Sequence, residues 1–278
     1  MSHSVPFVRQ VCYFLVAILA TSLLVACTPA GEGGRSPAID TALTVYAAAS
    51  LTDAFGEMAE RYEADHPNVT LTFNFAGSNQ LAAQIGAGAP VDVFASANPE
   101  QMEAAVAAGR IDAGAPVVFV TNRLVVIYPA DNPGNLTSLQ DLRNPHVLLV
   151  LAAEEVPVGR YSLAFLVAAS ADPSFGESFQ PDVLANVVSY EENVRAVLNK
   201  VSLGEADAGI VYTSDLATAP GVGRLDIPDA LNSIAHYPIA VLNDSPHQAA
   251  ARSFMDFVLS DDGQQILAGY GFGAGIPQ

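Results

Sequence analysis

The stretch "LTVYAAASLTDAF", residues 43–55, changes character at its middle. It begins as an apolar run typical of a buried strand, and from Leu51 its spacing is that of an amphipathic helix. Small alanines and Ser50 stand at the junction, where a ligand can approach the backbone closely. Because ligands of open α/β sheets bind beyond the carboxyl ends of the strands, this junction is a candidate binding site.

A second junction of the same kind follows in "FNFAGSNQLAAQI", residues 73–85, where a strand ends at Phe75 and a helix opens near Ser78. Two hydroxyls and the free backbone N–H groups of two helix starts would then lie on one rim of a sheet, which favours an anion. Serine is also a common helix N-cap, and for either serine alone that role is the simpler interpretation. The sequence leaves both roles open.

The rest of the chain continues this alternation of apolar strands and amphipathic helices. Three strand–helix repeats run from residue 43 to residue 109, and a second set begins with "NRLVVIYPA" at Asn122. Parallel neighbours in a sheet need crossover helices, so the pattern predicts an α/β fold with largely parallel sheets. We predict two lobes rather than one continuous sheet, with the last helices returning to the first lobe.

We divide the chain into four segments. They are a signal peptide at 1–26, a lipidated flexible tether at 27–41, a first lobe formed by 42–121 with 238–278, and a second lobe at 122–237. The strands near residues 122–129 and 237–243 are predicted to cross between the lobes and to act as a hinge.

The N-terminus has the pattern of a secretory signal. Arg9 precedes an apolar run at 11–26 that is too short to span a membrane. The tetrad "LVAC" at 24–27 resembles the bacterial lipobox, which implies cleavage before Cys27 and a lipid on its sulfur; an ordinary signal peptide cut near Ala26 is the alternative. The Gly-, Pro- and Ser-rich residues that follow are typical of a flexible tether. We therefore expect an extracytoplasmic protein that touches the membrane only through a lipid anchor.

Composition excludes several classes of partner. The formal net charge is −18, from 29 acidic and 11 basic residues, so nucleic acids and anionic membrane surfaces are poor partners. The five histidines are scattered without the spacing of metal ligands, and no structural or catalytic metal site is predicted. Cys12 lies in the predicted signal peptide and Cys27 would carry the lipid, so the mature domain has no disulfide.

The second lobe offers further candidates at its own strand ends. In "VPVGRY", Pro157 and Gly159 bracket a helix start at Val158, and another helix opens near Val194. In "GIVYTSD" a strand ends at Tyr212, for which a packed aromatic role is the simpler interpretation. The pattern alone does not bring these groups together.

Taken as a set, "VYAAASLTDAF", "FAGSNQLAAQI", "GAGAPVDVFASAN", "VPVGRY" and "GIVYTSD" resemble, in order and spacing, the periplasmic molybdate-binding proteins of bacterial ABC-type molybdate transporters. The resemblance covers about residues 43–272. It implies a type II periplasmic binding protein fold, in which each lobe is a mixed, mainly parallel sheet flanked by helices and the ligand lies in the interlobe cleft. It also implies a binding protein without enzymatic activity or cofactor, which delivers molybdate or tungstate to an ABC permease and its ATPase. We expect a monomer, because a capture protein must open and close.

The resemblance also implies which residues hold the oxyanion. They are the hydroxyls and amides of Ser50 and Ser78, the backbone amides of Val158 and Val194, and the hydroxyl of Tyr212. They would contact the metal only through the oxygens of the anion. Val158 departs from the alanine usual in the family and adds bulk to the pocket. Glu154 and Glu155 are expected to face solvent, because carboxylates pointing into the site would repel an anion.

Several alternatives stay open at this stage. Arg160 or Arg195 could be a direct ligand, although a neutral donor set suffices. Another oxyanion such as sulfate, or a small organic solute, could replace molybdate, since any fully deprotonated dianion needs only donors, whereas protonated phosphate needs an acceptor. A serine nucleophile is disfavoured because neither serine lies in a G-x-S-x-G motif or near a histidine motif. An adhesive or structural protein is disfavoured by the paired lobes.

Overall fold

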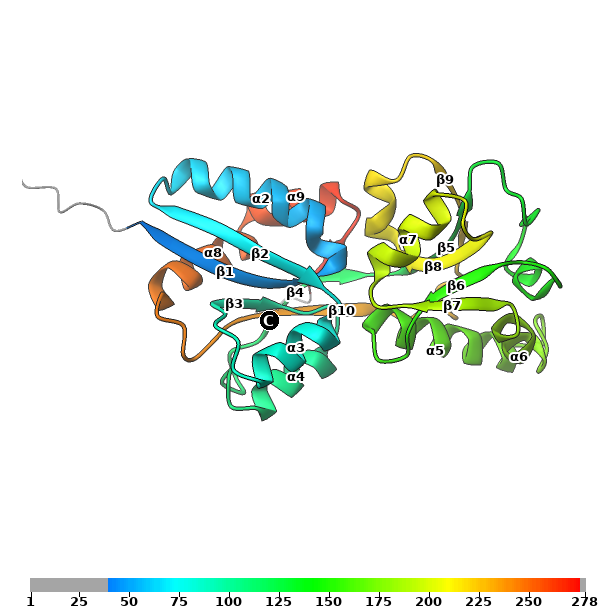
Figure 1. The fold of residues 1–278 in the computed structure, drawn as a ribbon, viewed down its shortest axis with the longest axis horizontal. Coiled ribbons are helices and arrows are strands. Elements are labelled where there is room, and N and C mark those ends of the chain that lie inside the picture. Colours follow the sequence, from blue (N-terminus) through cyan, green and yellow to red (C-terminus); the bar gives the residue numbers. More distant parts are fainter. Residues whose placement is uncertain (1–39, 276–278) are drawn as a thin grey trace, which may run out of the picture. The chain divides into compact units, whose positions relative to one another are not determined.

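The structure, a computed structural model, describes residues 40–275, which form one compact unit containing two β-sheets (Figure 1). The predicted signal peptide, Cys27 and nearly all of the tether lie outside the described residues. The first strand begins at Thr41, the last residue assigned to the tether, and its backbone N–H donates to Asn68 O at 2.8 Å.

The first sheet has six strands in the order β11-β4-β10-β3-β1-β2. Their bounds are β1 Thr41–Ala48, β2 Val69–Ala76, β3 Val93–Ala95, β4 Val117–Asn122, β10 Ala235–Val241 and β11 Gly273–Ala274. The helices that pack on it are α2 Thr52–Asp65, α3 Ser78–Gly86, α4 Pro99–Ala107, α8 Gln248–Leu259 and α9 Asp261–Gly269, and a short 3₁₀ turn, η1 Ala49–Leu51, joins β1 to α2.

Helices cover both faces of this sheet because its central strands are apolar on both sides. In β3, Val93 and Ala95 belong to the core that includes side chains of α2 and α8, whereas Phe94 belongs to a separate core with α3 and α4. Successive side chains of a strand point to opposite faces, so three consecutive apolar residues require two cores. The last helices, α8 and α9, pack on β10 and α2, as predicted for a chain that returns to the first lobe.

The second sheet has five strands in the order β7-β6-β8-β5-β9. Their bounds are β5 Leu124–Pro129, β6 Leu149–Ala152, β7 Val187–Glu191, β8 Ala208–Tyr212 and β9 Val222–Asp226. Its helices are α5 Pro157–Ala171, α6 Phe179–Leu184 and α7 Val194–Ser202, with 3₁₀ turns η2 Leu139–Arg143 and η3 Thr213–Thr218. Figure 1 shows α7 on one side of this sheet and α5 with α6 on the other.

The chain crosses between the sheets twice, but the predicted hinge strands do not themselves span both. Only Arg123 separates β4 in the first sheet from β5 in the second, and residues 227–234 lead back to β10. Asn232 ties the two crossings together, since its amide accepts from Leu124 N at 3.0 Å and donates to Leu124 O at 2.8 Å. Sheet membership therefore changes at Arg123, and Asn122 and 235–237 belong to the first sheet.

Both sheets contain more antiparallel pairing than the alternating pattern predicted. The pairs β1–β2, β1–β3, β6–β7 and β6–β8 are parallel, whereas β10 runs antiparallel to β3 and β4, and β5 runs antiparallel to β8 and β9. A strand that enters a sheet from the other lobe does not arrive through a crossover helix, so it is not constrained to be parallel. The two-lobed α/β fold with mixed sheets is confirmed.

Sequence inspection missed the strands β4, β9 and β11, the helix α6 and the short 3₁₀ turns. The residues of β4 precede the strand that was recognised at Asn122, and with only Arg123 between β4 and β5 the two read as one apolar run. Within residues 40–275, no helix is long and apolar enough to cross a membrane. The same residues contain no group of three or more His, Cys, Asp or Glu side chains able to hold a metal ion.

Candidate functional site

The strand register places the two serines side by side. Ala48 at the end of β1 pairs with Ala76 at the end of β2, and each serine follows two residues after its alanine. In the second sheet, β6 runs parallel to both β7 and β8, so the residues that follow these three strands also gather at one edge. In both sheets, the candidate residues therefore lie together just beyond the carboxyl ends of the strands.

One cavity is lined by all five residues that the resemblance implied. The full lining consists of Ala48, Ala49, Ser50, Ala76, Gly77, Ser78, Ala97, Val156, Pro157, Val158, Asn193, Val194 and Tyr212. All of these residues are neutral, and Ser50, Ser78 and Tyr212 are only 3%, 1% and 1% exposed. The empty space at this lining, part of which is open to solvent, amounts to about 220 Å³. A small solute would thus meet buried, neutral hydrogen-bonding groups.

The serine hydroxyls do not cap their helices, so the simpler structural role is excluded. The N-cap of α3 is Gly77, and no side chain caps η1, α2 or α3. Ser78 Oγ instead accepts from the backbone N–H of Ala97 at 3.0 Å, and the hydroxyls of Ser50 and Tyr237 lie 2.9 Å apart. Because Ser78 Oγ already accepts from a backbone donor, its own proton is available to the cavity.

The second lobe contributes the starts of two helices. Val158 lies in the first turn of α5, and Val194 is the first residue of α7. Backbone N–H groups in a first turn have no intrahelical acceptor, and the helix dipole there favours a negative charge. Asn193 caps α7 by accepting from Ala196 N at 3.0 Å, and both Asn193 and Val194 line the cavity.

Gly159 explains why the motif "VPVGRY" contains glycine. A Cβ at this position would lie 2.0 Å from the carbonyl oxygen of Ala153 and 2.5 Å from that of Ala152. Such contacts are sterically forbidden, so only glycine lets the first turn of α5 pack against the end of β6. The close approach brings Val158 to the cavity lining, where the bulkier valine is accommodated with 1% exposure.

Tyr212 presents an unsatisfied hydroxyl to the cavity. Its oxygen is buried and has no hydrogen-bond partner within the described residues. Burial, with a smaller effect of neighbouring Tyr237, raises the pKa of Tyr212 well above its usual value, so the hydroxyl stays protonated at neutral pH. The two tyrosine rings lie 5.9 Å apart, but no hydrogen bond of acceptable geometry joins their hydroxyls. Buried polar groups are almost always paired, so this hydroxyl is available to donate to a bound ligand.

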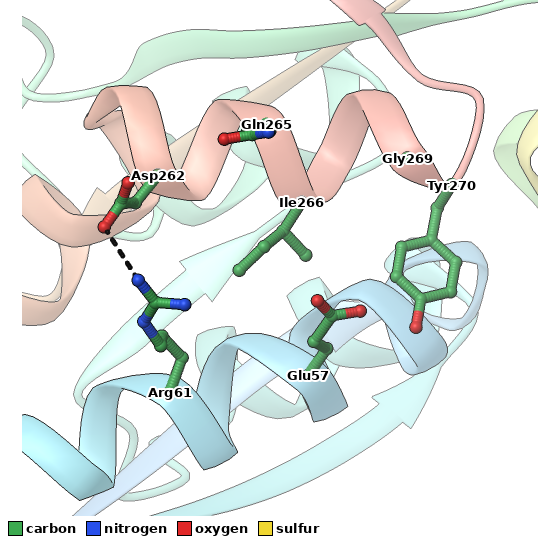
Figure 2. A pocket seen from close by; sticks show the side chains of 7 residues that line it. All are labelled: Glu57, Arg61, Asp262, Gln265, Ile266, Gly269 and Tyr270. Atoms are coloured by element: carbon green, nitrogen blue, oxygen red, sulfur yellow. Dashed lines mark hydrogen bonds and ion pairs between the residues drawn. The ribbon is translucent and has the colours of Figure 1, made fainter.

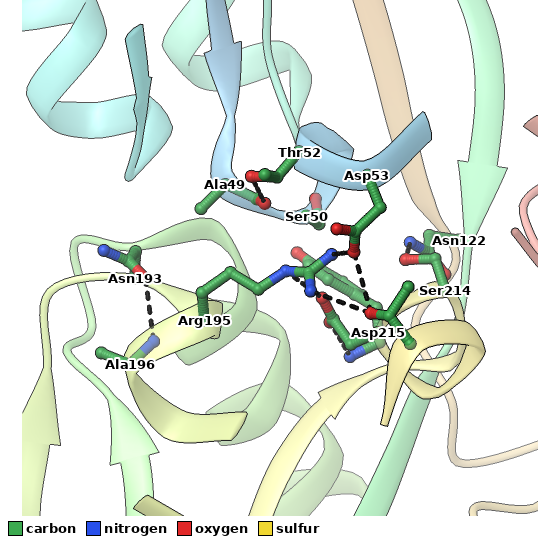
Figure 3. Close-up of polar contacts among 12 residues, drawn as sticks. Ala49, Ser50, Thr52, Asp53, Asn122, Asn193, Arg195, Ala196, Ser214 and Asp215 are labelled. Atoms are coloured by element: carbon green, nitrogen blue, oxygen red, sulfur yellow. Dashed lines mark hydrogen bonds and ion pairs between the residues drawn. The ribbon is translucent and has the colours of Figure 1, made fainter. Parts of the chain in front are cut away.

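The charged residues near the motifs do not line the cavity. Arg160, Glu154 and Glu155 are exposed, as expected for the two glutamates, which border a separate surface depression on the second lobe. Arg195 is held by other partners: it donates to Asp53 Oδ2 at 2.6 Å, and its Nε lies 3.2 Å from Asp215 Oδ1 (Figure 3). The arginines are therefore not placed as direct ligands.

Sequence reasoning missed the ion network that joins the lobes beside the cavity. Asp53 in the first turn of α2 accepts from Arg195 and from the Thr218 hydroxyl at 2.8 Å, both of which belong to the second lobe. Asp215 is 0% exposed and accepts from Tyr212 N at 3.0 Å. The Arg195 Nε and Asp215 Oδ1 form a close ion pair without the alignment of a hydrogen bond. No local sequence pattern links residues so far apart.

Asp215 is expected to make the folding stability depend on pH. Burial raises its pKa to about 6, against opposing effects of Arg195 and of the Tyr212 N–H, while Asp53 raises it further. A raised pKa means that the folded state holds the proton more tightly than the unfolded state, so stability falls as pH rises from about 4 to 6. The Asp215→Asn variant should lack this fall and gain about 3 kcal/mol relative to wild type between pH 4 and pH 7.

Urea unfolding at several pH values between 4 and 7 measures this difference. Asp141→Asn is a matched control, because hydrogen bonds led by that from Thr137 N lower the pKa of Asp141 to about 2. That carboxyl is ionised in both states above about pH 5, so its stabilising effect is constant there and is lost as the pH falls through the lower pKa of the folded state. A difference between Asp215→Asn and wild type that does not change with pH would contradict the assignment.

A larger depression elsewhere lacks the features of the cavity. Figure 2 shows it between α2 and α9, with Arg61 paired to Asp262 at 3.4 Å and Glu57 facing the same space as Tyr270. It has about 770 Å³ of empty space, part of which is open to solvent. Its carboxylates and its exposed ion pair suit neither an enclosed anion nor an apolar solute. The cavity between the sheets remains the candidate site.

Two mixed sheets that enclose a neutral cavity at the carboxyl ends of their strands define a solute-binding protein of the type II periplasmic class. The family model of the bacterial extracellular solute-binding proteins matches residues 43–273. The molybdate-binding protein of Mycobacterium tuberculosis H37Rv is 38% identical over 268 residues, which cover 93% of this chain and 95% of the relative. The chain therefore belongs to the bacterial extracellular solute-binding proteins.

Two solved structures share the fold. The substrate-binding domain of a protein described as a molybdenum ABC transporter from Clostridium difficile superposes with a TM-score of 0.63 at 30% identity, covering 84% of this chain and 99% of the other. The sulfate-binding protein of Mycobacterium tuberculosis H37Rv gives a TM-score of 0.74 at 19% identity, with 84% and 86% coverage. The second likeness concerns the fold alone, so the fold does not decide which anion is bound.

Proposed function

We propose that the protein binds molybdate, and tungstate with it, outside the cytoplasm and delivers it to an ABC importer. The observation that carries the proposal is the buried, unpaired hydroxyl of Tyr212 in a neutral cavity that Ser50 and Ser78 also line. The 38% identical relative that is named a molybdate-binding protein supports this choice of anion. The five ligand residues are Ser50, Ser78, Val158, Val194 and Tyr212.

The chemistry of the cavity suits a fully deprotonated tetrahedral dianion. Hydroxyl and backbone N–H groups supply donors, and the starts of α3, α5 and α7 add the positive ends of three helix dipoles. These local dipoles hold an anion in a chain whose net charge is −18. A protonated anion would need an acceptor, and no carboxylate belongs to the described lining.

Binding would favour the form in which both lobes contact the ligand. Contacts across the cleft already include Asp53 with Arg195, and Gln80 with Glu192 at 3.4 Å. A Cβ at Gly77 would lie 2.6 Å from the backbone oxygen of Glu192, so the lobes approach closely at this glycine. A ligand that accepts from both lobes at once binds the closed form better than the open one and shifts the population toward it.

The remaining parts of the proposal concern partners and location. We propose that Cys27 carries a lipid that anchors the mature protein, which otherwise makes no membrane contact. An ABC permease with its ATPase would receive the ligand from the closed form. The binding protein is proposed to act as a monomer and to need no cofactor beyond its ligand, since a capture protein must open and close freely.

We further propose that the protein has no enzymatic activity. The nearest approach to a catalytic triad within the described residues is Asp92, Ser245 and His247, which lie outside the cavity lining. Here the serine donates directly to Asp92 Oδ1 at 2.5 Å, and His247 Nδ1 lies 3.3 Å from that same oxygen. A nucleophilic serine must instead donate to the histidine, with the carboxylate orienting the imidazole. The cluster stabilises a turn.

Titration calorimetry on the full chain in detergent tests the function. Molybdate, tungstate, sulfate and phosphate are compared in one buffer at pH 8. Tight binding of the first two, weak binding of sulfate and no heat with phosphate would support a donor-only site with a size limit. Tighter binding of sulfate would establish the sulfate alternative. No heat with any of the four anions would overturn the proposal and direct attention to organic solutes.

A further inference from the structure

Tyr237 lies directly behind one of the proposed ligand residues. Its hydroxyl is 2.9 Å from that of Ser50, and the tyrosine, which belongs to β10, is fully buried. Either oxygen of such a pair can be the donor, so the distance alone does not fix where the protons point. The direction matters because Ser50 has one proton, which goes either to Tyr237 or to the cavity.

Asn122 indicates the direction. Its Oδ1 accepts from the backbone N–H of Arg123 at 3.0 Å and from the Thr213 hydroxyl at 3.1 Å. A backbone N–H can only donate, so the amide oxygen must face Arg123 and the amide nitrogen must face the other way. That nitrogen donates to Ser214 Oγ at 2.8 Å and to Tyr237 Oη at 3.3 Å (Figure 3 shows Asn122 beside Ser214). The Tyr237 oxygen is thus an acceptor, and its own proton is free to be donated.

We propose that Asn122 and Tyr237 are positioning residues that hold Ser50 as a hydrogen-bond donor to the ligand and thereby select anions that carry no proton. The inference rests on the proposed function. An anion without protons takes the Ser50 proton, and the serine oxygen then accepts the proton of Tyr237. The hydrogen bonds run in one direction, from Asn122 through Tyr237 and Ser50 to the ligand. A protonated anion would face the proton of Ser50 at the place where its own proton needs an acceptor.

Ser78 is also held as a hydrogen-bond donor to the cavity, but by a single backbone N–H. Its oxygen accepts from Ala97 N, which can only donate, so its proton is also directed away from that bond. The two serines are thus oriented by different means, one by a neighbouring backbone N–H and the other by two buried side chains of distant segments. Because the orientation of the Ser50 hydroxyl depends on side chains, a substitution can reverse the direction of its hydrogen bond, whereas the backbone donor of Ser78 cannot be removed in this way.

Sulfate and phosphate provide the test, because at pH 8 both are mainly dianions of similar size and phosphate keeps one proton. Their dissociation constants are measured on the full chain in detergent, by competition with molybdate in calorimetry. In Tyr237→Phe, Ser50 is free to accept, and the ratio of the phosphate constant to the sulfate constant should fall about 10-fold. Molybdate itself should bind about 2- to 10-fold more weakly.

Tyr62→Phe is the matched control, since the Tyr62 hydroxyl is buried and donates to Ser253 Oγ at 3.0 Å, away from the cavity. Its phosphate-to-sulfate ratio should equal that of wild type, because a merely structural tyrosine–serine bond does not change selectivity. An unchanged phosphate-to-sulfate ratio in a folded Tyr237→Phe variant would overturn the inference. The proposed function would still stand if the wild-type protein binds molybdate.

Circular dichroism and thermal unfolding establish whether Tyr237→Phe folds. If it does not, Asn122→Ala decides by the same ratio, because loss of the amide frees the Tyr237 oxygen to accept from Ser50. A fall in the ratio would support the inference, and a constant ratio would overturn it. A wild-type protein that binds no oxyanion would overturn the proposed function and the inference together.

Discussion

Replacing Tyr212 with phenylalanine is expected to weaken molybdate binding about 10- to 150-fold, because a hydrogen bond to a charged group contributes about 1.5–3 kcal/mol. The ring would keep its packing against Tyr237. The free protein should lose no stability and should gain a little, since the hydroxyl has no partner within the described residues and is buried. Calorimetry for binding and urea unfolding without ligand measure the two opposite effects.

Ser78→Ala is the informative companion to this variant. It removes a proposed donor of similar strength, but it also leaves Ala97 N without its acceptor. We expect the same range of affinity loss together with a loss of about 1–3 kcal/mol in the free energy of unfolding. Ser50→Ala, on the same lobe as Ser78, should weaken binding to a similar degree. Full affinity in either Tyr212→Phe or Ser50→Ala would disprove a site shared by the two lobes.

The second large effect is expected for Arg195→Met, which should lower the free energy of unfolding by about 3–5 kcal/mol at pH 7. Asp215 is 0% exposed, and without Arg195 its charge would stay buried with no cation beside it. The interlobe hydrogen bond to Asp53 would be lost as well. The loss should be smaller at pH 5, where the carboxyl of Asp215 is protonated. Urea unfolding at both pH values gives the comparison.

Two further variants separate this effect from a general loss of an arginine. Arg160→Met removes an exposed arginine and should change the unfolding free energy by no more than about 0.5 kcal/mol. In Arg195→Met combined with Asp215→Asn, the buried charge is gone, and most of the lost stability should return. A loss below about 1 kcal/mol in the single variant, or one that is equal at pH 5 and pH 7, would show that Asp215 is not the residue affected.

The elements that position the site could be predicted from local sequence. The alternation of apolar strands and amphipathic helices located β1, β2, α2 and α3. Small residues at the strand ends indicated where a ligand could approach. These features depend on neighbours within a few residues, which is the range over which periodicity and turn chemistry act.

The positions of the five proposed ligand residues came from the family resemblance, not from periodicity. Local pattern left Ser50 and Ser78 with an N-cap role and Tyr212 with a packing role. The structure decided against capping because the hydroxyl of Ser50 is bonded to Tyr237, which is 187 residues away in the chain. It also brought residues of both lobes to one cavity, although their role as ligands stays a prediction.

The sequence by itself determined the α/β class, the strand-to-helix junctions and the neutral character of the residues at those junctions. Only the tertiary structure decided that Arg195 pairs with Asp53, 142 residues away, rather than with a ligand, and that Asn122 and Tyr237 stand behind Ser50. The physical reason is that a hydrogen bond or ion pair has a reach of a few ångströms in space. Which distant segments meet within that reach is set by the packing of the sheets and not by any local pattern.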